Sequence, residues 1–116
     1  PSASPALRAL TATGLALAQS EGITVVHLGI GSVSDGAFHE ALNLAALTSA
    51  PIVFVVAVQQ LDDGAPIGPQ SAASPLDLAA AYGLSTTEVD GSDASAVLSA
   101  VRDARDATPH LLCANL

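Results

Sequence analysis

Seven consecutive apolar residues occupy positions 52–58, with the sequence Ile-Val-Phe-Val-Val-Ala-Val. Successive side chains of a β-strand point to opposite faces, so a strand that is apolar at every position must be covered on both faces. The run is far shorter than the ~20 residues that a transmembrane helix requires. It therefore predicts a central strand of a parallel sheet with helices packed on either side.

The segments around this run alternate between helical and extended patterns. Apolar spacing and capping signals predict three helices, over about 5–20, from Gly36 to just before Pro51, and over 75–82. A fourth helix is predicted to begin after a cap at Ser92 or Asp93. Apolar and β-branched runs predict further strands over 23–28, 86–89 and 111–113, and residues 61–74 predict a long loop. This order predicts one domain over residues 1–116, an α/β three-layer sandwich with a mostly parallel sheet.

Composition excludes several classes of function. Eleven acidic residues face three arginines and no lysine, for a net charge of −8, so nucleic acids and anionic membranes are poor partners. The N-terminus shows no basic segment before an apolar core, and a cytoplasmic location is expected. The single cysteine excludes an internal disulfide framework and a cysteine-based zinc cluster. A small core of Ala, Val, Leu and Ile predicts modest stability and makes oligomerisation an expectation.

Ligands of open α/β sheets bind beyond the carboxyl ends of the strands. Two such strand ends stand out, at residues 29–36 (Gly-Ile-Gly-Ser-Val-Ser-Asp-Gly) and 58–64 (Val-Gln-Gln-Leu-Asp-Asp-Gly). The first matches a dinucleotide-binding fingerprint poorly, because its third glycine comes too late and no acidic residue ends the following strand.

Read together, the segments match a more specific pattern. The matching residues are Gly29-x-Gly31, then Gly36-Ala-Phe-His-Glu-Ala-Leu-Asn43, Pro51-Ile-Val-Phe-Val-Val56, Ala81-Tyr-Gly83, Val89-Asp-Gly-Ser-Asp93 and Pro109-x-Leu-Leu112. In this order they resemble the alpha subunit of thiamine-diphosphate-dependent 2-oxo acid dehydrogenases of the pyruvate and branched-chain type. The resemblance covers roughly residues 11–116 and implies the diphosphate-domain type of the thiamine-diphosphate-binding fold.

In that family the first strand end is Gly-Asp-Gly and the second is Asn-Asn. The aspartate, the second asparagine and a backbone carbonyl two residues further on hold the Mg²⁺ that binds the cofactor's diphosphate. The resemblance places Ile30 at the aspartate, Val58 and Gln59 at the two asparagines, and Leu61 at the carbonyl. Isoleucine cannot coordinate a cation, and Gln59 is one methylene longer than asparagine for an ion that demands octahedral geometry.

The sequence therefore departs from the family at its metal site. The positions that match the family's cofactor site are Gly29, Ile30, Gly31, Ser32, Val58, Gln59 and Leu61, and we expect this site to be vacated. No catalytic residue, metal ligand or cofactor is predicted, and thiamine diphosphate with Mg²⁺ is the alternative. Cys113 replaces a glutamate common in the family, and the family's histidine-bearing loop and N-terminal covering region match nothing within residues 1–116.

Three hypotheses of function remain open at this point. The first is a degenerate, non-catalytic homologue (a pseudoenzyme) with a structural or assembly role, associating with itself or with a beta-like or alpha-like dehydrogenase subunit. The second is an alpha-type component of a split 2-oxo acid dehydrogenase, active only with a partner chain that supplies the missing parts. The third is a less charged ligand in the vacated pocket.

Several chemically active residue types have simpler structural roles. We expect His39 to be structural, His27 to be a hydrogen-bonded core histidine, His110 to be exposed and Cys113 to be an inert, buried thiol. Packing roles are expected for Glu40 and Asn43, a solvated acidic turn for Asp62 and Asp63 rather than a calcium loop, and a turn with a helix cap for residues 90–93.

Overall fold

The computed structural model describes residues 4–59, 61–62, 65–66 and 71–116. Its main sheet has four parallel strands in the order β1-β2-β6-β5. These strands are β1 (Thr24–Gly29), β2 (Ile52–Val58), β5 (Ser85–Asp90) and β6 (His110–Asn115). A separate antiparallel pair joins β3 (Leu61–Asp62) to β4 (Ala65–Pro66). The all-parallel main sheet confirms the predicted fold class.

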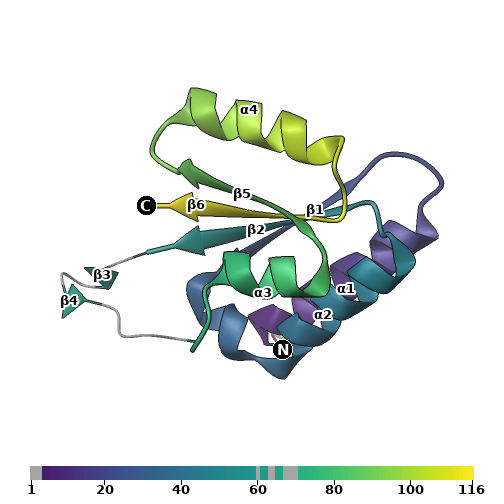
Figure 1. Cartoon of the computed structure of the whole chain (residues 1–116), viewed down its shortest axis with the longest axis horizontal. Coiled ribbons are helices and arrows are strands. Elements are labelled where there is room, and N and C mark those ends of the chain that lie inside the picture. The colour runs from purple at the N-terminus through teal and green to yellow at the C-terminus, as the bar shows by residue number, and fades with distance from the viewer. Residues whose placement is uncertain (1–3, 60, 63–64, 67–70) are drawn as a thin grey trace.

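Helices cover the two faces of the sheet unequally (Figure 1). On one face lie α1 (Pro5–Ala18), α2 (Gly36–Thr48) and α3 (Pro75–Tyr82). On the other face α4 (Ala94–Arg105) packs on β5, β6 and β2. This face is therefore covered over its β5 side, whereas side chains of β1 on the same face stay exposed. None of the described helices is both long and apolar enough to cross a bilayer.

β2 has the central place that its sequence predicts. It pairs with β1 on one side and with β6 on the other, and Ile52 through Val56 are all buried. Its side chains alternate between two cores: Ile52, Phe54 and Val56 face α1 and α2, while Val53 and Val55 face α4. Phe54 meets Phe38 of α2 edge to face, with ring centroids 6.4 Å apart.

Local signals set the helix boundaries. Ser4, Asp35, Ser74 and Asp93 each accept a hydrogen bond from a backbone N–H in the first turn of the helix that follows. Gly83 ends α3 at φ +90°, a left-handed conformation that glycine adopts without strain. Of the two caps considered for α4, the structure selects Asp93.

Two of the three histidines differ from their predicted environments. His27 is exposed, because it lies on the face of β1 that α4 does not reach, so the predicted core position was wrong. His110 is 4% exposed, because it is the first residue of β6 and lies under α4, so its predicted exposure was also wrong. Its Nε2 lies 2.9 Å from the Thr87 hydroxyl of β5. His39 has a contact in line with the predicted structural role, because its Nε2 lies 3.1 Å from the Val33 carbonyl oxygen.

Burial of His110 predicts a loss of stability in mild acid. Burial lowers the pKa of this imidazole below its ordinary 6.5, although the backbone of Ala107 partly opposes the shift. The unfolded chain therefore binds the proton first, and the free energy of unfolding falls as the pH drops below about 6.5 and through the folded pKa. Urea unfolding at several pH values between about 8 and 5 measures this fall. In His110→Gln the same pH range should give a smaller slope; an unchanged slope would contradict the assignment.

Candidate functional site

The carboxyl ends of β1 and β2 bring the predicted site residues together. β1 ends at Gly29, which is paired with Ala57 of β2, so the following residues Ile30 and Val58 are neighbours at the same sheet edge. The chain continues from Gly29 into a 3-10 helix, η1 (Ile30–Ser34). η1 leads directly to Asp35, the cap of α2.

The two hydrocarbon side chains at this edge are part of the core. Ile30 and Val58 are both half-buried, and both pack against the cluster that contains Leu28 and Phe38. They present no oxygen at the positions where the family resemblance implies an aspartate and an asparagine. This packing also argues against an alternative ligand in a vacated pocket, because Ile30 already contacts the core there.

The remaining predicted site residues differ in their exposure. Gly29, Gly31 and Gln59 are exposed, and Ser32 is buried. A Cβ built on Gly29 would meet no described atom within 4 Å, so nothing closely approaches this glycine. Leu61 begins β3, but its side chain and that of Asp62 lie outside the description, as does all of Asp63.

Two described carboxylates, that of Asp35 after η1 and that of Asp90 at the end of β5, already have partners. Asp35 accepts a hydrogen bond from the Ala37 N–H and another from the Ser4 hydroxyl, each at 2.9 Å. These two bonds lower the pKa of Asp35, the backbone bond contributing most. Asp90, at the end of β5, accepts from the Ser92 N–H at 2.9 Å and from the Ser92 hydroxyl at 2.6 Å, and these bonds lower its pKa too.

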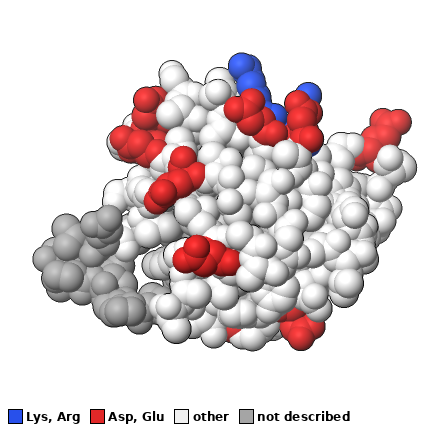
Figure 2. Space-filling model, viewed as in Figure 1, with Lys and Arg blue, Asp and Glu red and all other residues white. Residues whose placement is uncertain are grey.

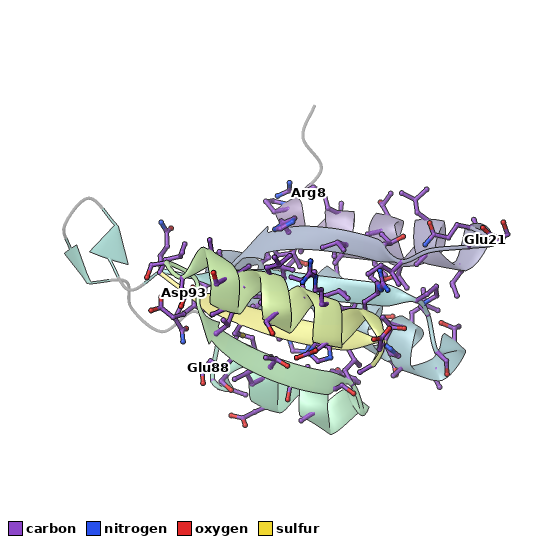
Figure 3. All side chains as sticks on the ribbon, turned by 90° about the horizontal axis from the view of Figure 1, so that it is seen from above. Arg8, Glu21, Glu88 and Asp93 are labelled. Carbon is purple, nitrogen blue, oxygen red and sulfur yellow. The ribbon has the colours of Figure 1, made fainter. Side chains whose placement is uncertain are left out.

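Sequence reasoning did not find a polar pair on β5 and β6. Asn115 Nδ2 donates to Glu88 Oε1 at 2.9 Å (Glu88 is labelled in Figure 3). Glu88 is the register partner of Cys113, two residues before Asn115. The pair joins residues 27 positions apart in the chain, and no local pattern in the sequence predicts it.

These residues do not fit a diphosphate-bound magnesium ion. Mg²⁺ requires several oxygen ligands in near-octahedral geometry. Two of the side chains at the matching positions are hydrocarbons that pack into the core, and the acidic groups Asp35 and Asp90 cap or close turns. Within the described ranges, no three His, Cys, Asp or Glu side chains are grouped as metal ligands.

Residues 3–110 match the family described as "Dehydrogenase E1 component". The chain belongs to this family. It is 38% identical over 94 residues to "2-oxoisovalerate dehydrogenase subunit alpha 1, mitochondrial" of Arabidopsis thaliana, covering 72% of this chain and 18% of the relative. It is 37% identical over 100 residues to "3-methyl-2-oxobutanoate dehydrogenase subunit alpha" of Mycobacterium tuberculosis, covering 82% and 27%.

A third relative is the alpha subunit of "Acetoin:2,6-dichlorophenolindophenol oxidoreductase" from Bacillus subtilis, with 38% identity over 87 residues, covering 74% of this chain and 26% of the relative. The fold resembles the solved structure of a putative thiamin diphosphate-dependent enzyme from Mycobacterium smegmatis. That match has a TM-score of 0.73 and 23% identity, and it covers 92% of this chain and 21% of that one. The chain thus spans between 18% and 27% of the length of these relatives.

The reaction rate of the Cys113 thiol tests how well this part of the core excludes water and reagents. Cys113 is 2% exposed, and burial, with a contribution from Glu88, raises the pKa of the thiol from 9.0 to about 11. Because the thiolate is the reactive species, a shift of this size leaves about 100-fold less of it than in the unfolded chain. We expect native Cys113 to react with a disulfide reagent at least about 100-fold more slowly than in urea.

An exposed thiol in the same protein is the matched control. In a Cys113→Ser, Ser99→Cys variant the thiol is on the exposed side of α4, and labelling should be nearly as fast in the native state as in urea. Equal native rates for Cys113 and for this control would contradict the closed core.

Proposed function

We propose that this chain is a degenerate, non-catalytic homologue of the 2-oxo acid dehydrogenase alpha subunit core, with a structural or assembly role. One observation carries the proposal: Ile30 packs as a hydrocarbon against the core at the position of the family's metal-binding aspartate. Val58 does the same at the neighbouring strand end. The scaffold of the family is retained while its ion ligands are replaced.

Electrostatics supports the proposal. A diphosphate group carries negative charge and is bound in the family largely through Mg²⁺, whereas this chain has a net charge of −8 and no lysine. Arg102 and Arg105 lie in the last turn of α4, and Arg8 lies on α1. The described carboxyl edge carries Asp35 and Asp90 as carboxylates, and their negative charge disfavours a diphosphate group there.

The placement of the candidate acid-base groups supports a non-catalytic role as well. His110 stands at the amino end of β6, and His27 lies in the middle of β1. His39 is engaged with the Val33 carbonyl oxygen and meets Tyr82 edge to face. Cys113 is a buried thiol where the resemblance implies a glutamate. Of these four groups, His39 is the one shown to contact the segment that follows β1, and its Nε2 is already engaged there with a backbone carbonyl oxygen.

Calorimetry with thiamine diphosphate tests the loss of the cofactor site. We expect no Mg²⁺-dependent binding heat with the natural sequence, because no side-chain oxygen is available at residues 30 and 58. The triple variant Ile30→Asp, Val58→Asn, Gln59→Asn restores the family's ligands and should show measurable Mg²⁺-dependent affinity if the rest of the pocket persists. Ile30→Leu, which keeps a hydrocarbon, is the matched control. Stoichiometric, Mg²⁺-dependent binding by the natural sequence would refute the proposal.

The alternative is an alpha-type component of a split, thiamine-diphosphate-dependent 2-oxo acid dehydrogenase. It is favoured by the relatives, which are named as alpha subunits and match over most of this chain. Under this hypothesis the chain should copurify with a beta-like subunit and support decarboxylation of a branched-chain 2-oxo acid or pyruvate. Copurification without turnover supports the assembly role, and turnover that depends on this chain supports the alternative.

We propose oligomeric partnership with the chain itself, or with a beta-like or alpha-like dehydrogenase subunit, and a cytoplasmic location. The high proportion of small residues in the core supports an association that adds buried surface. The excess of acidic residues supports partners other than nucleic acid or anionic membranes.

A further inference from the structure

The two faces of the main sheet are covered by hydrophobic cores of different size. Beneath α1, α2 and α3, the core contains Phe38, Leu42 and Phe54, which are among the largest fully buried side chains. On the other face, α4 contributes only Ala100 and Ala104 as buried residues, and a methyl group buries little apolar area. α4 is therefore held to the sheet more weakly than the helices of the first face.

His110 is a polar residue inside this smaller core. It is 4% exposed, and it is on the same face of β6 as Leu112 and Ala114, because the side chains of a strand alternate. Its Nε2 lies 2.9 Å from the Thr87 hydroxyl, whereas its Nδ1 has no hydrogen-bond partner among the described residues. The Ala107 backbone is close to the ring without completing a hydrogen bond to Nδ1. A buried nitrogen without a partner costs free energy, so the burial of His110 works against the packing of α4.

His110 lies beneath the carboxyl end of α4. The helix ends at Arg105, and the chain then turns back into β6, which runs in the opposite direction (Figure 1). Ala104, in the last turn of α4, belongs to the same core as Val53, the register partner of His110 on β2. Because α4 closes this core, moving its carboxyl end away from the sheet would bring water to the imidazole.

No charged side chain of α4, β2 or β5 faces His110. From the sheet, the ring meets Val53 of β2 and Thr87 of β5, while Glu88 is on the opposite face of β5, bonded to Asn115. Figure 2 shows positive and negative side chains together on the outer side of α4. The charged residues near the carboxyl end of this helix are all exposed: Arg102, Asp103, Arg105 and Asp106. A proton on the ring thus has no acidic side chain beside it, and burial is the main cause that lowers the pKa of His110.

We propose that α4 is an acid-sensitive cover of the sheet, which is released from β5 and β6 when His110 takes up a proton. In the closed state the ring is buried and neutral, whereas in the open state it is solvated and binds a proton more readily. Acid therefore shifts the equilibrium toward the open state. Release exposes an apolar surface of β2 and β6 that α4 covers at neutral pH, formed by Val53, Val55, Leu112 and Ala114. This response involves neither thiamine diphosphate nor Mg²⁺, so it does not depend on the proposed non-catalytic role.

Local release of α4 is distinct from acid unfolding of the whole chain. Elements with few buried apolar contacts open at lower free energy than the rest of a protein. Amide hydrogen exchange measured by NMR gives the opening constant of each element, after correction for the effect of pH on chemical exchange. At pH 8 the amides of residues 98–104 in α4 should have opening constants at least about tenfold larger than those of β2.

The same measurement at lower pH tests the role of His110. Between about pH 8 and pH 5 the opening constants of α4 should rise at least about threefold, because the open state gains a proton that the closed state binds less readily. His110→Gln carries an amide that can bond to the Thr87 hydroxyl but has no titrating ring, so the rise should disappear. The matched control is His27→Gln, which removes an exposed imidazole two strands away on the same sheet face and should retain the rise.

The outcomes separate local release from other responses to acid. An α4 that opens more readily than β2, with a rise in acid that His110→Gln removes and His27→Gln retains, supports the proposal. Equal opening constants for α4 and β2 overturn it, because α4 then opens only with the whole chain. A constant opening of α4 across the pH range, a rise that persists in folded His110→Gln or a rise that His27→Gln removes also overturns it.

A second measurement replaces His110→Gln if circular dichroism shows that this variant does not fold. The His110 ring of the natural chain is then titrated by NMR. A midpoint below the ordinary 6.5 supports the proposal, because the closed state must bind the proton less readily than the open state. A midpoint at or above 6.5 overturns it, since acid would then not favour release.

Discussion

Burial of β2 on both faces is the constraint on which the rest of the structure depends. A strand with five consecutive buried residues needs a partner strand on each side and a helical layer above and below. The helices α1 and α2 provide one layer and α4 the other. The same arrangement fixes where the strand ends meet, because parallel strands direct all their carboxyl ends to one edge. The candidate site exists where it does because β1 and β2 are neighbours.

At that edge, hydrocarbon side chains stand at two positions where the family resemblance implies oxygen ligands. A magnesium site requires oxygen ligands, and their replacement by Ile30 and Val58 turns the same two positions into extensions of the core. Hydrocarbon side chains that pack against the core contribute to stability by burial, whereas an aspartate there would need a cation or hydrogen bonds to compensate its desolvation. In the proposed non-catalytic role, residues 30 and 58 contribute to packing of the core instead of binding a cofactor.

The distribution of charge gives the molecule two different sides. β5 carries Glu88 and Asp90, and α4 carries Asp103 between Arg102 and Arg105, while α1 and β1 together carry Arg8 as their only charged residue. The small number of positive charges is in line with the proposed loss of an anionic cofactor.

The sequence by itself determined the α/β class, the bounds of β2 and α3, and the pair of strand ends at which the family's site would lie. These features depend on periodicity, on local capping chemistry and on a resemblance carried by contiguous motifs. Only the tertiary structure decided which face of each strand is covered. His27 and His110 sit in strands of similar apolar character, yet the first is exposed and the second buried, because α4 reaches β6 and stops short of β1. The bond between Glu88 and Asn115 likewise depends on strand order, which no local pattern of residues encodes.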